Sequence, residues 1–171
     1  MACAASHAGA EPFTLTNHRL FISAHVNGVP TEALLDSAAE ASIVDPAFAA
    51  TAHLPPGMAI TIKGSGGAAK AHVVEGVEVE ALGVIMHPDA VVITDLGDIS
   101  RRLAGRPVRA IVGRELFDSA RLAIDFRSRT IRTVRSRSAP AGVELALTRH
   151  AGVESIAVTA DGVSAQAEFD L

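Results

Sequence analysis

The sequence predicts an all-β domain with a few short helices. Apolar or alternating runs of strand length recur along the chain, separated by Gly, Pro and Asn, which is typical of strands joined by turns. Hydrophobic residues make up 49% of the 171 residues, yet Phe is the only aromatic type, and Trp and Tyr are absent. The core must therefore be built from small and β-branched side chains, which favours a tightly packed sheet.

The strands are expected in hairpins and short buried runs. Asn27-Gly28 is a strong signal for a tight hairpin turn, and Gly64-Ser65-Gly66-Gly67 predicts a flexible hairpin tip. The strands themselves are predicted at residues 13–16, 20–26, 32–35, 58–63, 73–80, 84–86, 91–94, 108–112, 122–126 and 130–134.

Three short segments are expected to be helical. Asp45-Pro46 predicts a helix that runs to about residue 53, because Asp caps a helix and Pro fits its first position. A helical turn is expected at 98–103, and a short helix at 114–119 follows the strand that Gly113 stops.

Charge and metal-ligand spacing exclude several classes of function. A net charge of −4 gives no reason to expect nucleic acid as a partner, and no apolar run approaches the length of a membrane span. The seven histidines show no metal-ligand spacing, so we expect neither a metal site nor another cofactor. Cys3 is the single cysteine, which rules out an intrachain disulfide.

Residues 1–12 are expected to be a flexible N-terminus. The small-residue stretch ending in Ala8-Gly9-Ala10 resembles the tail of a secretory signal, whose cleavage would start a mature chain at Glu11. This interpretation predicts a periplasmic or secreted protein. A floppy N-terminus of a cytoplasmic protein is the alternative.

An internal repeat relates the two ends of the chain. Residues 22–36 align without a gap with residues 156–170, so that Gly28 falls on Gly162 and Asp36 on Asp170. Just upstream, residues 15–18 resemble residues 147–150 after a two-residue adjustment. A linker is predicted at 136–142, and the repeat indicates that the hairpin ending at Asp36 is built a second time after it.

Three elements of the sequence resemble elements of pepsin- and retropepsin-type aspartic proteases, and they occur in the same order as in that family. Leu34-Leu35-Asp36-Ser37-Ala38-Ala39 is similar to the family's active-site motif of two hydrophobic residues, Asp, Thr or Ser, and Gly. Ile111-Val112-Gly113 looks like the element that supports the active-site loop, and 122–126 with its hairpin resembles the closing strands.

The resemblance, which spans residues 13–134, implies a closed acid-protease barrel lobe at 13–137. Residues 138–171 would then be a linker and the opening hairpin of a second lobe, and Gly64, Ser65, Gly66 and Gly67 would form the flap over the substrate. Asp36 would be the catalytic aspartate, and Ser37, Ala38 and Ala39 its loop. Ser37 retains the hydroxyl that family members use to brace two such loops against each other.

An aspartic protease needs two carboxylates that share one proton, because like charges about 3 Å apart cannot both ionise. Asp36 would pair with Asp36 of a second copy in a homodimer, or with Asp170 of a second lobe. The printed sequence ends one residue after Asp170, so the second version needs further chain. Ala38 departs from the family, which has Gly there, and Glu40 adds a third carboxylate nearby.

Three classes of function remain open at this point. The first is an endopeptidase that hydrolyses peptide bonds of an extended peptide or protein substrate. The second is a catalytically inactive module of the same fold that binds peptides or dimerises, which Ala38, Glu40 and the truncated repeat favour. The third is an unrelated β-barrel binding domain, in which Asp36 would lie far from any second aspartate.

Overall fold

The all-β class is confirmed by the computed structural model, which describes residues 9–64, 67–134, 142–150 and 153–171. The segment containing Cys3, most of the linker at 136–142, and Ser65 and Gly66 of the hairpin tip lie outside these residues. The strands are β1 (Glu11–Pro12), β2 (Thr14–Thr16), β3 (Arg19–Val26), β4 (Val29–Leu35), β5 (Ile43–Val44), β6 (Met58–Gly64), β7 (Gly67–Val74), β8 (Val79–Ala81), β9 (Val84–Met86), β10 (Val91–Ile93), β11 (Ala110–Val112), β12 (Arg121–Asp125), β13 (Thr130–Val134), β14 (Thr148–His150), β15 (Val153–Ala160) and β16 (Val163–Glu168).

The helices are short and lie between strands of the main sheet or directly after it. Asp45 caps the first one as expected, since its carboxylate accepts the N–H of Ala47 at 2.9 Å and Pro46 occupies the first position. The predicted turn at 98–103 is part of a longer helical segment formed by two elements. The helices are α1 (Pro46–Thr51), α2 (Gly97–Ile99), η1 (Ser100–Ala104) and α3 (Glu115–Ser119).

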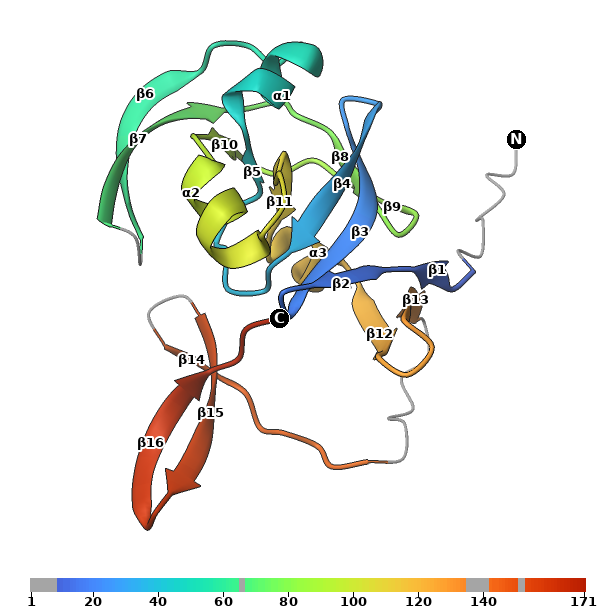
Figure 1. Ribbon diagram of the computed structural model, residues 1–171, viewed down its shortest axis with the longest axis vertical. Helices are drawn as coiled ribbons and strands as arrows, with labels where there is room; N and C mark the ends of the chain where they lie inside the picture. Colours follow the sequence, from blue (N-terminus) through green and yellow to red (C-terminus); the bar gives the residue numbers. More distant parts are fainter. Residues whose placement is uncertain (1–8, 65–66, 135–141, 151–152) are drawn as a thin grey trace.

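The strands form one large sheet and two small ones (Figure 1). The order in the large sheet is β6-β7-β10-β5-β11-β4-β3-β8-β9, and β2 also pairs with β3. The small sheets are β1-β13-β12 and β14-β15-β16. Among the described strands no pairing joins β6 to β9, so the large sheet is an open path, whereas the family resemblance implies a closed barrel.

The position of β11 is the feature that shapes the site. β11 lies between β4 and β5, parallel to β4 and antiparallel to β5. Ile111 stands opposite Leu34, and Val112 stands opposite Leu35. The chain therefore leaves the sheet after β4, makes the loop that begins with Asp36, and returns as β5 on the other side of β11.

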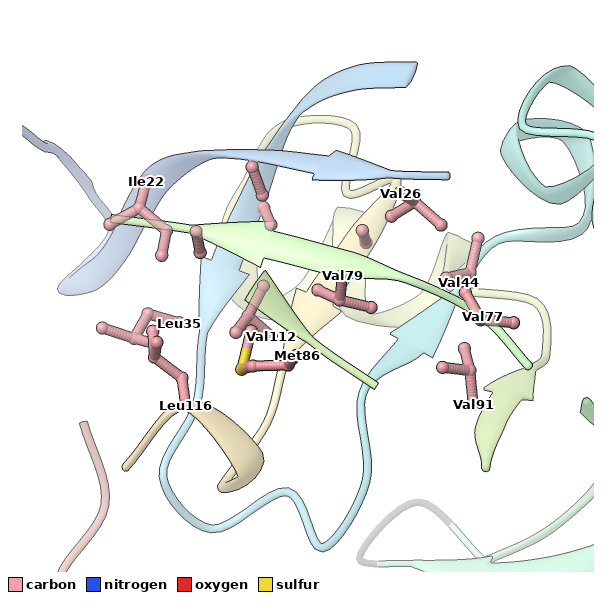
Figure 2. Packing of buried hydrophobic residues seen from close by; sticks show 14 of the residues in the cluster. Ile22, Val26, Leu35, Val44, Val77, Val79, Met86, Val91, Val112 and Leu116 are labelled. Carbon is pink, nitrogen blue, oxygen red and sulfur yellow. The ribbon is translucent and has the colours of Figure 1, made fainter. Parts of the chain in front are cut away.

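The end of β4 is buried on both faces, which explains its uninterrupted apolar sequence. Successive strand side chains point to opposite faces. Leu35 joins the main core with Val112 and Leu116, as Figure 2 shows, whereas Leu34 joins a second cluster with Ile111 on the other face. Leu96, Ala104 and Val108, from η1 and the segments beside it, cover that second face.

Two predicted boundaries are wrong. Residues 73–80 were expected to be one strand, but β7 ends at Val74 and β8 begins at Val79, because the chain turns between them at Gly76 with φ +71°. The flexible N-terminus was expected to reach residue 12, but Glu11 and Pro12 form β1 and pair with Ile131 and Thr130 of β13.

The β14–β16 sheet repeats the pairing of β2–β4 with an offset of 134 residues. Val26 pairs with Val29 at the β3–β4 turn, and Ala160 pairs with Val163 at the β15–β16 turn. The tips match as well, since Asn27 and Asp161 both have φ near +50° and each is followed by a Gly with positive φ. A Gly lacks a Cβ and adopts this backbone readily.

The upstream part of the repeat needs no two-residue adjustment, so that part of the sequence alignment is wrong. Thr14 pairs with Phe21 in β2–β3, and Thr148 pairs with Ser155 in β14–β15, at the same offset of 134 residues. The similar letters at 15–18 and 147–150 are therefore not structurally equivalent. Strand pairing identifies the counterparts, because a shift of two residues would break the hairpin register.

We expect Leu35→Ala to lower the free energy of unfolding by about 2–5 kcal/mol, because it leaves a cavity in the main core. Leu35 is fully buried, with 0% exposure. Leu145→Ala is the matched control, since that side chain is 53% exposed and its loss should cost no more than about 0.5 kcal/mol. Urea unfolding measures both, and equal effects would contradict this description of the core.

Candidate active site

Asp36 begins the loop between β4 and β5, and the loop itself fixes its carboxylate. One carboxylate oxygen accepts the backbone N–H groups of Ala38 at 2.9 Å and Ala39 at 3.0 Å. The backbone N–H of Asp36 donates to the carbonyl of Val112 at 3.1 Å, which ties the loop to β11. Hydrogen bonds of this kind are how Asp stabilises a tight turn.

The turn accommodates Ala38 without left-handed backbone. Ala38 is not among the described residues with positive φ, so its Cβ causes no backbone strain of that kind. Glu40, the additional carboxylate in this loop, is exposed. The two departures from the family motif are therefore compatible with an ordered loop that aims the Asp36 carboxylate.

Gly113 supports the loop by close approach of its backbone. A Cβ on Gly113 would lie 2.8 Å from the carbonyl oxygen of Ala39 and 2.9 Å from the carbonyl carbon of Ala41. The next residue, Arg114, donates its backbone N–H to the same carbonyl of Ala39 at 3.0 Å. Glycine is thus required at the end of β11 because any side chain would push the loop away.

Two residues that the sequence did not single out lock this contact. The carboxylate of Glu115 accepts the backbone N–H of Ser42 at 2.7 Å and its hydroxyl at 3.1 Å. The Ser42 hydroxyl oxygen in turn accepts the N–H of Gly113 at 3.1 Å. Ser42 is 2% exposed, so the network fixes the far end of the loop inside the protein.

Ser37 links the Asp36 loop to the end of the β14–β16 sheet. Its hydroxyl donates to the carbonyl of Phe169 at 3.2 Å and accepts the backbone N–H of Leu171 at 3.2 Å. Both partners are neighbours of Asp170 in the chain. The chain end accordingly returns to the main body (Figure 1), where Leu171 lies beside Ser37.

The carboxyls of Asp36 and Asp170 lie close enough to interact. Burial raises the pKa of Asp36 above its ordinary value, and the negative charge of Asp170 and a hydrogen bond with it raise this pKa further. The N–H groups of Ala38 and Ala39 oppose the increase without cancelling it. Asp170 also forms an ion pair with Arg19, whose Nη1 lies 3.6 Å from Oδ2 of Asp170.

The hairpin predicted to be the flap is formed by β6 and β7. Gly64 and Gly67 are its last paired residues, and the tip residues Ser65 and Gly66 lie outside the described part of the chain. β7 pairs with β10, which pairs with β5 at the end of the Asp36 loop. The hairpin is therefore connected to the loop through two intervening strands.

A groove on the main sheet lies away from the two aspartates. It has a volume of about 790 Å³ and is lined by Val29 and Pro30, at the start of β4, together with α1 and η1. Asp36 follows the other end of β4, six residues from Pro30, or about 20 Å at the usual strand rise. A smaller cavity of about 220 Å³ lies beside Ser37 and Phe169.

A comparison with known protein families found a match. The sequence model of the family described as "Aspartyl protease" matches residues 22–116, which is more than half of the chain and extends from β3 to α3. This chain belongs to the aspartyl protease family. The match contains both the Asp36 loop and the Ile111-Val112-Gly113 element of the aspartyl protease. A comparison with curated proteins found no match.

The described residues contain neither a metal-binding cluster nor a membrane-spanning helix. No group of three or more His, Cys, Asp or Glu side chains in these parts of the chain could hold a metal ion. No helix within them is long and apolar enough to cross a membrane.

Replacing Gly113 by Ala is expected to lower the free energy of unfolding by about 1–3 kcal/mol, because the new methyl group must displace the backbone at Ala39 and Ala41. Gly142→Ala is the control, since nothing lies within 4 Å of a Cβ there. Thermal unfolding of the two variants measures the difference. An unchanged Gly113→Ala melting temperature would show that the contact is not tight.

Asp36→Asn is expected to stabilise the protein at neutral pH and to have less effect at acidic pH. A raised pKa means that the folded state keeps the Asp36 proton to higher pH than the unfolded chain does. The resulting stability is complete below the unfolded pKa and is lost as pH rises through the folded pKa. Asn removes this loss, and its amide oxygen can still accept the loop N–H groups.

Urea unfolding of both proteins at pH values on either side of this window measures the effect. Asp161→Asn is the control, because Asp161 is exposed in the β15–β16 turn and Asn tolerates its positive φ. A stability difference between the native protein and Asp36→Asn that does not change with pH would rule out a raised Asp36 pKa.

Proposed function

We propose that this aspartyl protease family member is an endopeptidase whose catalytic pair is Asp36 and Asp170. The observation that carries the proposal is the double hydrogen bond of Ser37 to Phe169 and Leu171, the two neighbours of Asp170. It holds the start of the Asp36 loop against the segment that follows β16, and each of the two follows the second strand of a matching hairpin. The coupling between the two carboxyls supports the same pairing.

The chemistry follows from one proton shared between two carboxyls. The ionised member takes a proton from a water molecule as general base, while the protonated member donates a hydrogen bond to the oxygen of the scissile carbonyl. Water adds to the carbonyl carbon, and the C–N bond then breaks as the nitrogen receives a proton. The raised pKa of Asp36 suits it to be the protonated member.

The substrate class follows from the family and from the neighbouring strands. Members of a protease family act on protein, and an extended peptide can add backbone hydrogen bonds to a hairpin that covers it. The β6–β7 hairpin is the candidate for that cover, with its tip at residues 64–67. We propose an extended protein segment as the substrate.

The homodimer version, in which Asp36 pairs with its copy, is the competing proposal. It leaves the Ser37 hydrogen bonds and the matching registers of the two hairpins without a role in catalysis. The inactive-module version rests on Ala38 and Glu40, but the loop hydrogen bonds to Asp36 are formed with both residues present. The geometry therefore favours the Asp36–Asp170 pair.

Cleavage of denatured casein by the full-length protein, at acidic and neutral pH, tests the proposal. We expect Asp36→Asn and Asp170→Asn each to lower kcat by at least about 100-fold, because each removes one half of the acid–base pair. Asp161→Asn, in an exposed turn, should cleave like the native protein.

The outcomes separate the three versions. Loss of cleavage in Asp36→Asn but not in Asp170→Asn would support the homodimer. Cleavage that persists in Asp36→Asn would eliminate Asp36 as a catalytic residue. A native protein that binds casein at every pH without cleaving it would be the binding module.

A further inference from the structure

Arg19 contacts only one of the two aspartates. It is the first residue of β3, and its Nη1 lies 3.6 Å from Oδ2 of Asp170. The salt bridges among the described residues include none to Asp36, whose carboxylate instead accepts two backbone N–H groups and faces Asp170. The positive charge is thus placed on one side of the pair.

The internal repeat makes this asymmetry a property of the sequence. Strand pairing at the offset of 134 residues puts Val153 in the place of Arg19, since Arg19 pairs with Thr16 and Val153 pairs with His150. Valine has no charge. The cation beside Asp170 thus has no charged counterpart at the equivalent position of the second hairpin.

We propose that Arg19 is a positioning residue that keeps the negative charge of the pair on Asp170 and leaves the shared proton on Asp36. The proposal rests on the proposed function and assigns the roles within it: Asp170 is the general base, and Asp36 is the proton donor to the carbonyl. An opposite charge nearby favours the ionised form of a carboxyl, and burial favours the neutral form.

The other charged groups near Asp170 do not reverse this assignment. Asp36 faces it from the loop after β4, and Arg19 faces it from β3. Two cations and two anions line the cavity beside Phe169, so their charges balance. They come from α3, the residue before it, β14 and β15. These ionic groups are Arg114, Asp118, Arg149 and Glu154, joined by the Arg114–Asp118, Arg149–Asp118 and Arg149–Glu154 ion pairs.

A surface ion pair of this kind contributes little to folding stability, because both partners are partly exposed, at 34% and 41% of their side chains. Its effect on a shared proton is different in kind. The two ways of placing one proton on two neighbouring carboxyls differ only by their surroundings, so a modest electrostatic preference decides between them.

The pH dependence of kcat/KM in the full-length protein tests the role. We expect Arg19→Gln to move the acidic limb of the profile to higher pH by about half a unit to one unit, because the charged form of the pair loses its cation. Arg19→Lys should restore most of the native profile. Arg102→Gln is the control, since Arg102 is exposed and pairs with Asp98 on another surface.

A native-like pH profile in an active Arg19→Gln enzyme would overturn the proposal. A purely structural role of Arg19 would lower kcat at every pH without moving the acidic limb, and that result would also overturn the proposal. If Arg19→Gln fails to fold, another uncharged substitution at Arg19 that does fold takes its place. The proposal then predicts a native pH profile for Arg19→Lys and a shifted profile for the uncharged variant.

A titration of the ¹³C carboxyl resonances of Asp36 and Asp170 in full-length protein provides a readout that does not require cleavage. With one proton on the pair, we expect Asp36 to show the chemical shift of a protonated carboxyl. In Arg19→Gln we expect a smaller difference between the chemical shifts of the two resonances. Protonation of Asp170 instead would refute the assignment. Absence of cleavage together with the expected titration would refute the proposed function and leave the effect of Arg19 standing.

Discussion

The contact between the Gly113 backbone and the loop at Ala39–Ala41 is the constraint on which the site depends. β11 can lie between β4 and β5 only if its end passes directly behind that loop, where there is no room for a side chain. The same insertion places Val112 where its carbonyl accepts the N–H of Asp36. Ser42 and Glu115 then fix the far end. One close backbone approach thereby orients the carboxylate.

The electrostatics of Asp36 follow from this packing. The loop is held against a buried sheet, and its carboxyl loses part of its hydration there, which favours the neutral form. The hydroxyl of Ser37 brings the end of a second hairpin, and with it a second carboxyl, to the same place. Burial and a neighbouring like charge therefore act in the same direction, and the structure tolerates an arrangement that is unfavourable for two ionised groups.

Local patterns in the sequence were enough to predict the strand before Asp36, the Asn27-Gly28 turn, the Asp45 cap and the strand that ends at Gly113, because each depends on residues close together in the chain. The break between β7 and β8 was missed, since apolar alternation continues across Gly76. The Ser42–Glu115 network and the Arg19–Asp170 ion pair could not be predicted, because they join residues that only the fold brings together and that carry no local signal.

The β14–β16 sheet has the strand registers of β2–β4 but not its neighbours. β4 is covered along its outer edge by β11, and β3 carries β8, whereas among the described strands β16 pairs with β15 alone. A row of backbone N–H and C=O groups on β16 is thus left able to accept another strand. Such an open edge promotes self-association of the protein through edge-to-edge strand pairing.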